Sequence, residues 1–209
     1  MSVFTKTQFA AMLKAAAAKI ADEHESLSAL DAATGDGDHG VTIHRTMQAV
    51  DAATDENVDK PLSDFVKAVA MKVMMCDGGS TSPLLGSFFM GFGNAAPADE
   101  LTPEQTAAFF EAALAGFYGI SKAELGDKTM MDSMRPAIET LASELTDGSG
   151  DIKAAFDAAA AAAAEGAEKT KEYVAKFGRA RTMGERAIGH QDAGATSIMH
   201  IFNAFASTL

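Results

Sequence analysis

Apolar residues recur at helical spacing through most of this sequence, whereas the alternation typical of β-strands is nearly absent. One apolar stripe runs through residues 103–120, and similar stripes run through residues 62–74, 131–142 and the end of the chain. Because a helix with one apolar stripe buries that stripe against other helices, the pattern predicts roughly eight packed helices with short connections. We therefore expect an all-α bundle in which residues 1–209 form a single domain.

Two segments carry signals for the start of a helix. Thr102, Pro103 and Gln105 supply an N-cap, a proline at the first helical position and a capping-box partner. Ser82 followed by Pro83 predicts a second start of the same kind.

The composition excludes several classes of protein. The net charge is -12, from 17 basic and 29 acidic residues, which argues against nucleic acid or an anionic membrane as a partner because both require a basic surface. The only cysteine, Cys76, allows no internal disulfide and no cysteine-rich zinc site; we expect it to be buried in a helix of a cytoplasmic protein. The first 26 residues are typical of an amphipathic helix rather than a signal peptide, and no apolar run is long enough to span a bilayer.

The stretch GDGDHG, residues 35–40, matches the glycine spacing of the dinucleotide-binding fingerprint. That fingerprint requires a preceding strand and a parallel sheet, and the residues before Gly35 give no strand signal. A pyrophosphate cradle also directs bare N–H groups at negative charge, whereas this loop is rich in carboxylates. The Rossmann interpretation is therefore rejected.

The carboxylates themselves indicate a metal site. Gly35 and Gly37 interrupt any continuous helix, so the backbone can bring Asp31, Asp36 and Asp38 together. Three like charges in proximity need a cation between them, and hard oxygen ligands suit Mg²⁺, which is commonly shared with substrate phosphates. Asp and Gly are also frequent turn residues, but a turn needs neither His39 nor a third carboxylate. An EF-hand fits less well because its bidentate glutamate is missing.

Three further segments offer donors for phosphate. Residues 77–83 and 190–197 are glycine-containing connections that open a helix, where backbone N–H groups favour anions. Between them Arg179, Arg181 and Arg186 form the densest basic cluster of an acidic chain, and arginine pairs well with phosphate. Together with the carboxylates, these segments favour a nucleotide site over ordinary helix connections.

Other chemically suggestive residues are assigned no function. Lys128 in GDKT is similar to the end of a Walker A loop, but the upstream glycine at the required spacing is missing. The histidines His24, His44 and His200 fall on helical patterns and are expected to be structural or exposed.

The segments LDAATGDGDHG, GGSTSPLLGSFF, SKAELGDKTMMD and GRARTMGERAIGHQDAGATS resemble the signature regions of the nucleotide-binding L subunits of dihydroxyacetone kinases (the DhaL type). The resemblance extends from about residue 5 to the C-terminus. It implies an eight-helix antiparallel barrel with ADP or ATP and two Mg²⁺ ions at one end.

The family pattern places functional residues on this chain. The metal ligands fall on Asp31, Asp36 and Asp38. The nucleotide contacts fall on His39, Gly40, Val41, Thr42, Ser80, Thr81, Ser121, Met130, Arg179, Asp192, Ala193 and Gly194, with His39 and Arg179 expected to stabilise phosphate. Two departures stand out: the usual G-G-A-S-G-P is G-G-S-T-S-P here, and D-P-G-A is D-A-G-A, which removes a rigid proline at position 193.

The resemblance also implies partners. A separate K subunit holds dihydroxyacetone and supplies the base for its hydroxyl, and a phosphocarrier-type M subunit of the phosphotransferase system rephosphorylates bound ADP. A chain of 209 residues without a fused K domain favours this coenzyme arrangement, and a homodimer or a heteromeric complex stays open. The alternatives are an ATP-exchanging kinase domain for another small ketose or acceptor, as in the fatty-acid kinase system, and a non-catalytic helical module stabilised by metal. His39 favours the triose kinases, because the fatty-acid kinase loop is expected to read G-D-T-G.

Overall fold

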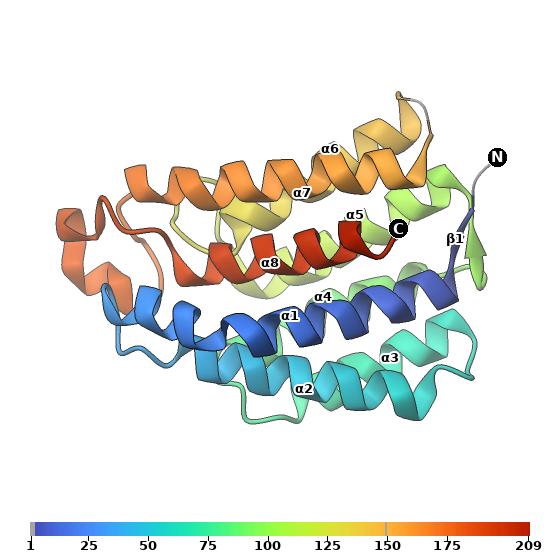
Figure 1. Cartoon of the computed structure of the whole chain (residues 1–209), viewed down its shortest axis with the longest axis horizontal. Coiled ribbons are helices and arrows are strands. Elements are labelled where there is room, and N and C mark those ends of the chain that lie inside the picture. The colour runs from blue at the N-terminus through green and yellow to red at the C-terminus, as the bar shows by residue number, and fades with distance from the viewer. Residues whose placement is uncertain (1–2, 149) are drawn as a thin grey trace.

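The structure, a computed structural model, describes residues 3–148 and 150–209, and its regular elements are almost all helical (Figure 1). Within these residues the α-helices are α1 (Lys6–Ala32), α2 (His39–Asn57), α3 (Leu62–Met74), α4 (Thr81–Ala95), α5 (Pro103–Ser121), α6 (Met131–Thr146), α7 (Ile152–Lys169) and α8 (Ala193–Ser207). Two 3-10 helices, η1 (Thr170–Glu172) and η2 (Arg179–Ala187), lie between α7 and α8, and the short strands β1 (Phe4–Thr5) and β2 (Glu100–Leu101) pair antiparallel. The all-α fold class is confirmed.

The helices form a closed ring. Each helix packs against its neighbours along the chain, and α8 completes the ring by packing against both α7 and α1. Successive helices run in opposite directions, so the connections that follow α1, α3, α5 and α7 all lie at the same end of the molecule, on the left in Figure 1. This arrangement is the antiparallel barrel of eight helices that the resemblance implies, and it brings four distant segments of the chain together at one end.

The interior of the ring is filled by side chains. Phe9, Phe92 and Phe109 are fully buried, and the ring of Phe92 lies 5.1 Å from that of Phe9 and 4.4 Å from that of Phe109. The small internal cavity lined by Leu13 and Phe202, among others, measures about 10 Å³, which leaves room for no more than a water molecule. The interior of the barrel is therefore a packed core rather than a pore. A ligand can bind only outside this core, at an end of the barrel.

The predicted helix starts have different outcomes. Thr102 caps α5 and forms the expected capping box with Gln105, so that prediction is confirmed. The start at Ser82 is wrong, because α4 begins at Thr81 and Ser82 lies in its first turn. The Ser82 hydroxyl instead accepts a hydrogen bond from the Gly78 amide and donates one to the Cys76 carbonyl, which stabilises the preceding turn.

The prediction for Cys76 is also wrong. It lies in the bend that follows α3 and is half-buried rather than buried within a helix. Its Sγ is 3.1 Å from the Ser82 hydroxyl, so a polar partner is available in this turn. The residue therefore belongs to a connection at the end of the barrel where the four segments meet.

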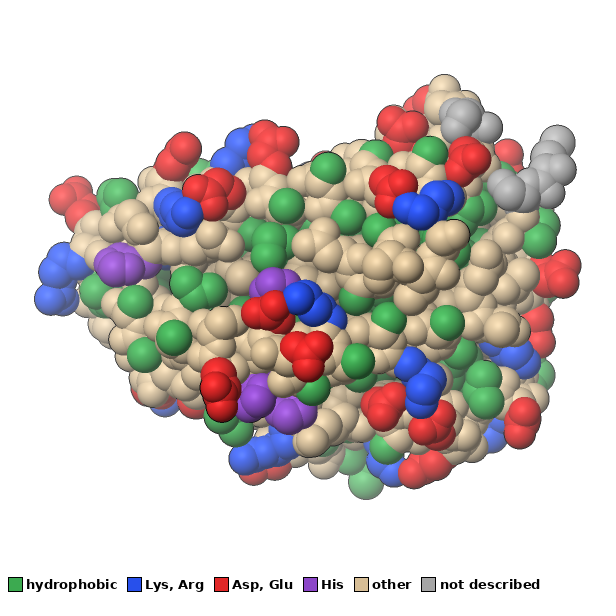
Figure 2. Space-filling model, in the orientation of Figure 1, with side chains coloured by type: hydrophobic (Ala, Val, Ile, Leu, Met, Phe, Trp, Pro, Cys, Tyr) green, Lys and Arg blue, Asp and Glu red, His purple; other side chains and the backbone are tan. Residues whose placement is uncertain are grey.

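The distribution of charged side chains on the surface shows no large basic patch on the face in view (Figure 2), as expected for an acidic chain. On the face shown in Figure 2, acidic and basic side chains are interspersed, and the basic ones do not gather into a single patch. Among the described residues, no helix combines the length and the apolar character needed to cross a bilayer.

Candidate functional site

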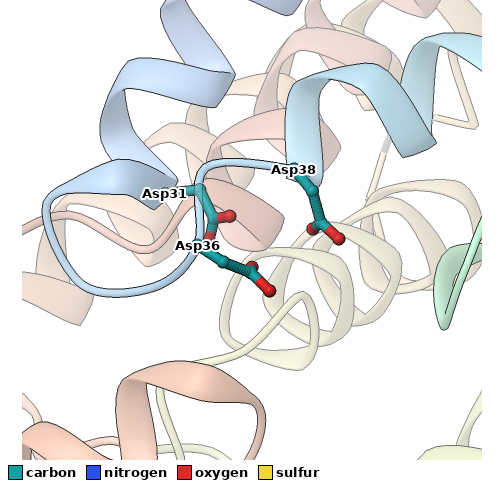
Figure 3. Close-up of side chains that lie close together, drawn as sticks. All are labelled: Asp31, Asp36 and Asp38. Atoms are coloured by element: carbon teal, nitrogen blue, oxygen red, sulfur yellow. The ribbon is translucent and has the colours of Figure 1, made fainter.

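Asp31, Asp36 and Asp38 converge at the end of the barrel where the four connections meet (Figure 3). Asp31 belongs to the last turn of α1, Asp36 lies in the loop, and Asp38 immediately precedes α2. Each carboxylate offers one oxygen atom, and these atoms all lie within 4.8 Å of one another. We call these three residues the carboxylate site.

The conformation of the loop brings the carboxylates together. The Gly35 amide donates to the Asp31 carbonyl at 2.5 Å, and the His39 amide donates to Asp31 Oδ2 at 3.3 Å. Gly37 has φ +77°, which disfavours other residue types, and a Cβ on Gly35 would lie 2.8 Å from Asp31 Oδ1. The glycines therefore allow the chain to turn back on itself, which brings the three carboxylates together as the metal-site hypothesis requires.

The electrostatics of the carboxylate site favour a cation. Burial, followed by the charges of Asp36 and Asp31, raises the pKa of Asp38, and Arg179 opposes this shift. The Nε atom of Arg179 lies 2.9 Å from Asp36 Oδ2, so one positive group already reaches the cluster. Three hard oxygen donors at this spacing fit Mg²⁺, which prefers carboxylate and water oxygens.

A cavity of about 720 Å³ opens beside the carboxylate site. Most of the residues singled out in the sequence line it. They are Asp31, Asp36, Asp38, His39, Thr42, Ser80, Thr81, Ser121, Met130, Arg179, Asp192, Ala193 and Gly194. Its volume lies in the range typical of ligand pockets, and its wall combines carboxylates, hydroxyls and apolar side chains.

Gly40 and Val41 are not among the residues that line the cavity, so their contact with a nucleotide stays a prediction from the family pattern. Gly40 is buried against α1, where a Cβ would lie only 1.8 Å from the His24 carbonyl oxygen and 2.4 Å from Ser28 Oγ. Val41 is 46% exposed. Gly40 thus permits the close approach of α1 and α2 that supports the carboxylate site.

The glycine-rich turn before α4 presents a helix N-terminus to the cavity. The side chain of Thr81 is turned inward, where its hydroxyl donates to the Gly78 carbonyl at 2.5 Å and lies 2.9 Å from Thr46 Oγ1. Ser80, which precedes α4, is exposed and lines the cavity together with Gly79. Because the first amides of a helix favour negative charge, this end of α4 is suited to an anionic group.

The N-terminus of α8 faces the same cavity. Asp192 caps this helix by accepting a hydrogen bond from the Ala195 amide at 2.7 Å. Burial raises the pKa of Asp192 to about 7, although this hydrogen bond and the charge of Lys128 oppose the shift. The adjacent Ala193 and Gly194 complete this side of the wall.

His39 is a neutral hydrogen-bonding group in this site. Burial lowers the pKa of His39 to about 4, and the charge of Asp31 opposes the shift only in part. Its Nε2 atom lies 3.2 Å from the Ser197 hydroxyl of α8. The imidazole therefore links α2 to α8 without carrying a positive charge at neutral pH.

Apart from Met130 and Ala193, the apolar part of the wall was not found from the sequence. Leu84 of α4, Phe117 and Ile120 of α5, and Phe177 of the segment between α7 and α8 all line the cavity. Ile120 and Phe177 are 57% and 42% exposed. The sequence signal for this wall was a large apolar side chain near the end of a helix. Helical periodicity alone does not distinguish such a side chain from one in the core.

Residues 170–192, which we call the strap, cross from α7 to α8 and carry the predicted arginine cluster. Of that cluster only Arg179 lines the cavity, whereas Arg181 and Arg186 are exposed outside its wall. Gly178 and Ala180, on either side of Arg179, also belong to the wall. The strap thus contributes one basic side chain to the site rather than three.

Comparison with known families matches residues 33–207 of the chain to the DAK2 domain. This chain belongs to the DAK2 domain family. The DAK2 domain described here is 36% identical over 185 residues to the PEP-dependent dihydroxyacetone kinase, ADP-binding subunit DhaL, of Escherichia coli (strain K12), with 88% of each chain covered. It is 35% identical over 204 residues to the ADP-binding subunit DhaL of PEP-dependent dihydroxyacetone kinase 2 of Listeria innocua, with 96% of this chain and 94% of the relative covered.

The fold of this DAK2 domain also occurs within a longer kinase. The native dihydroxyacetone kinase of C. freundii superposes with a TM-score of 0.74 at 25% identity, over 96% of this chain and 34% of the C. freundii chain. The structure of that kinase in complex with AMP-PNP and Mg²⁺ also gives a TM-score of 0.74, at 24% identity. The DAK2 domain therefore corresponds to about a third of the C. freundii enzyme.

Proposed function

We propose that this chain is the nucleotide-binding subunit of a dihydroxyacetone kinase, in which residues 1–209 form one kinase domain acting in the cytoplasm. It transfers a phosphoryl group from a Mg²⁺-bound adenine nucleotide to dihydroxyacetone held by a separate K subunit. The observation that carries the proposal is the single cavity in which the carboxylate site and two helix N-termini meet, in a DAK2 chain whose relatives are named ADP-binding subunits.

Each part of the wall has a role in this proposal. Asp31, Asp36 and Asp38 hold two Mg²⁺ ions, which neutralise phosphate charge when bound. The N-termini of α4 and α8 donate hydrogen bonds to the phosphates, and Arg179 stabilises the charge of the transferred group. Positioning and charge stabilisation of this kind supply most of the catalysis in phosphoryl transfer.

The apolar side of the cavity accommodates the base of the nucleotide. Phe117, Ile120 and Met130 offer apolar surface there, and Ser121 adds a hydroxyl. Gly40 allows α1 to pack closely on α2 beside the loop, and the backbone of Gly40 and Val41 stays a proposed contact of the nucleotide.

The base that accepts the proton of the substrate hydroxyl belongs to the K subunit in this proposal. A general base works best when its pKa is near the working pH, and the pKa of His39, at about 4, is far below it. The nucleotide stays bound as ADP and is rephosphorylated in place by an M subunit of the phosphotransferase system. The complex is therefore heteromeric while it works.

The first test is to denature the freshly purified protein and identify the released nucleotide and metal by mass spectrometry. The proposal predicts ADP and magnesium in near-stoichiometric amounts. A protein that retains neither, and that binds neither when they are added, contradicts it. A protein that binds ATP only loosely supports an exchanging kinase instead of the coenzyme arrangement.

A substitution in the carboxylate site tests the metal assignment. Asp36→Asn removes one charge from the cluster and the partner of Arg179, so we expect loss of Mg²⁺-dependent ADP binding by at least about tenfold, measured by calorimetry. The helical circular dichroism should persist because the Asp36 side chain is 42% exposed. Asp59→Asn, an equal change of charge at an exposed position after α2, is the control. Unchanged ADP binding by the Asp36 variant contradicts the assignment.

A further inference from the structure

The two ends of the strap are held close together by hydrogen bonds, and we call this closure the neck. The first and last residues of the strap come together, because the Asp192 amide donates to Thr170 Oγ1 at 2.9 Å and the Gly189 amide donates to the Lys171 carbonyl at 2.7 Å. Between these ends the chain runs out to Arg179, whose Nε atom pairs with Asp36. The position of Arg179 over the carboxylate site therefore depends on how firmly the neck is held.

Lys128 lies in this neck. Its ammonium group donates to the Thr170 carbonyl at 2.5 Å and also to the His190 carbonyl, one at each end of the strap. The side chain is only 2% exposed and lines the cavity. One lysine thus joins the end of α7 to the residues that precede α8.

The turn that carries Lys128 is shaped to place this side chain. Lys128 has φ +60°, in the left-handed region that few non-glycine residues occupy. Asp132 stabilises the turn by accepting hydrogen bonds from the Gly126 amide at 2.5 Å and from the Thr129 amide at 2.7 Å. A second link reaches the strap from the same turn, where the Lys176 amide donates to the Asp127 carbonyl at 3.1 Å.

We propose that Lys128 is a positioning residue of the nucleotide site, which joins the two ends of the strap and so fixes Arg179 beside the carboxylates. The physical reason is the shared donor: without the ammonium group, the carbonyls of Thr170 and His190 lose the hydrogen bonds that tie the two ends of the strap together. The Thr170 carbonyl also lies at the C-terminal end of α7, where a positive charge is favoured. The inference rests on the proposed function for its effect on nucleotide, but its effect on the strap is independent of any ligand.

The first experiment compares Lys128→Met with the unaltered protein by hydrogen exchange. Methionine has a similar length and no donor, so the Gly189 amide and its neighbours in the strap should exchange at least tenfold faster, while the amides of α1 and α4 keep their rates. Lys171→Met is the matched control, because the Lys171 ammonium lies on the same strap and pairs locally with Glu168. Equal strap exchange in Lys128→Met and the unaltered protein overturns the proposal.

The second experiment asks whether Lys128 acts through Arg179. The affinity for ADP with Mg²⁺ is measured for Lys128→Met, Arg179→Ala and the double variant. We expect each single change to weaken binding by about tenfold, and the double variant to be little weaker than either, because both changes remove the same positioned arginine. Fully additive losses overturn the inference, as does weaker binding by Lys128→Met with unchanged strap exchange, which would mean that Lys128 contacts the nucleotide itself.

Two further variants keep the test decisive. Lys128→Arg retains charged donors and should restore most of the strap protection that the methionine variant loses. If the methionine variant fails to fold, Lys128→Gln retains a shorter, uncharged donor and should show the same loosening to a smaller extent; wild-type exchange in that variant overturns the proposal. If the unaltered protein binds no ADP, the proposed function fails, and the exchange result still decides the role of Lys128 in the strap.

Discussion

At the scale of single residues, Arg179 joins the C-terminal part of the chain to the N-terminal part through an ion pair. It lies on the strap and pairs with Asp36, which follows α1. Its side chain is 74% exposed, so its ion pair contributes little to stability, and in the proposed function its role is to stabilise the phosphates of the nucleotide.

Replacing Arg179 by alanine is therefore expected to affect transfer more than folding. The rate of phosphoryl transfer, measured with the partner subunits present, should fall on the order of 10²-fold or more, because a transition-state charge loses its stabilising arginine. The free energy of unfolding in urea should change by less than about 1 kcal/mol. Arg181→Ala, on the same strap but outside the cavity wall, is the control. An unchanged rate in Arg179→Ala would remove this residue from the site.

We expect His200 to make the stability of the protein sensitive to pH. It lies on α8, and its buried Nδ1 has no hydrogen-bond partner among the described residues. Burial lowers the pKa of His200 from 6.5; Glu23 on α1 opposes the shift and Lys19 adds to it. Below pH 6.5 the unfolded chain therefore takes up a proton that the folded chain does not, and stability falls as the pH falls.

This dependence can be measured by urea unfolding at about pH 7.5 and about pH 5.5. Between these conditions the unaltered protein should lose more unfolding free energy than His200→Gln, which cannot take up the proton. The same substitution at exposed His190 is the control. Identical losses in the unaltered protein and His200→Gln would exclude this origin of the pH dependence.

At the scale of elements, the barrel depends on close contacts between neighbouring helices. On α5 a Cβ at Gly116 would lie 2.3 Å from the Ser87 carbonyl oxygen of α4, whereas a Cβ at Gly119 would have nothing within 4 Å. The two glycines lie one turn apart on one helix, so they separate the steric effect from helix propensity.

The same substitution should therefore have opposite effects at these two positions. Gly116→Ala is expected to lower the free energy of unfolding by about 1–3 kcal/mol, because α4 and α5 must move apart. Gly119→Ala should raise it by up to about 1 kcal/mol through helix propensity alone. Chemical denaturation of both variants measures the difference, and an equal sign for the two changes would show that the helix contact does not control the result.

At the scale of the whole molecule, the ring places every functional segment at one end and the phenylalanine core inside. Four connections that are distant in sequence meet around the cavity because successive helices run in opposite directions. A ligand bound there would contact α1, α4, α5 and the strap at once, and its binding energy would oppose the opening of the ring.

Ligand binding should therefore raise the melting temperature of the entire barrel. At 100 times its dissociation constant, ADP with Mg²⁺ should add about 2.7 kcal/mol of stability, which corresponds to an increase of about 5–10 °C for a domain of this size. Protein stripped of metal by a chelator should show no such gain from ADP alone. If Mg²⁺ stabilises the protein and ADP adds nothing further, the domain is a metal-stabilised module rather than a nucleotide subunit.

Part of this protein could be predicted from local pattern. The apolar stripes of α3 and α5 and the capping box of Thr102 depend on residues within one or two turns, and they were predicted correctly. The carboxylate site was also recognised, because its members lie within eight residues of one another and the intervening glycines allow the chain to turn back. Their assignment as metal ligands stays a prediction.

The remaining features depend on contacts between distant segments. Ser82 was wrongly predicted as a cap because its hydroxyl is used by the turn behind it, and Gly40 does not line the cavity because α1 covers it. The two carbonyls bound by Lys128 lie 42 and 62 residues away along the chain. The sequence by itself determined the helices and the chemical character of the loops, since these follow from neighbouring residues. Only the tertiary structure decided which loops share a cavity and which side chains face it, because closure of the ring sets those distances.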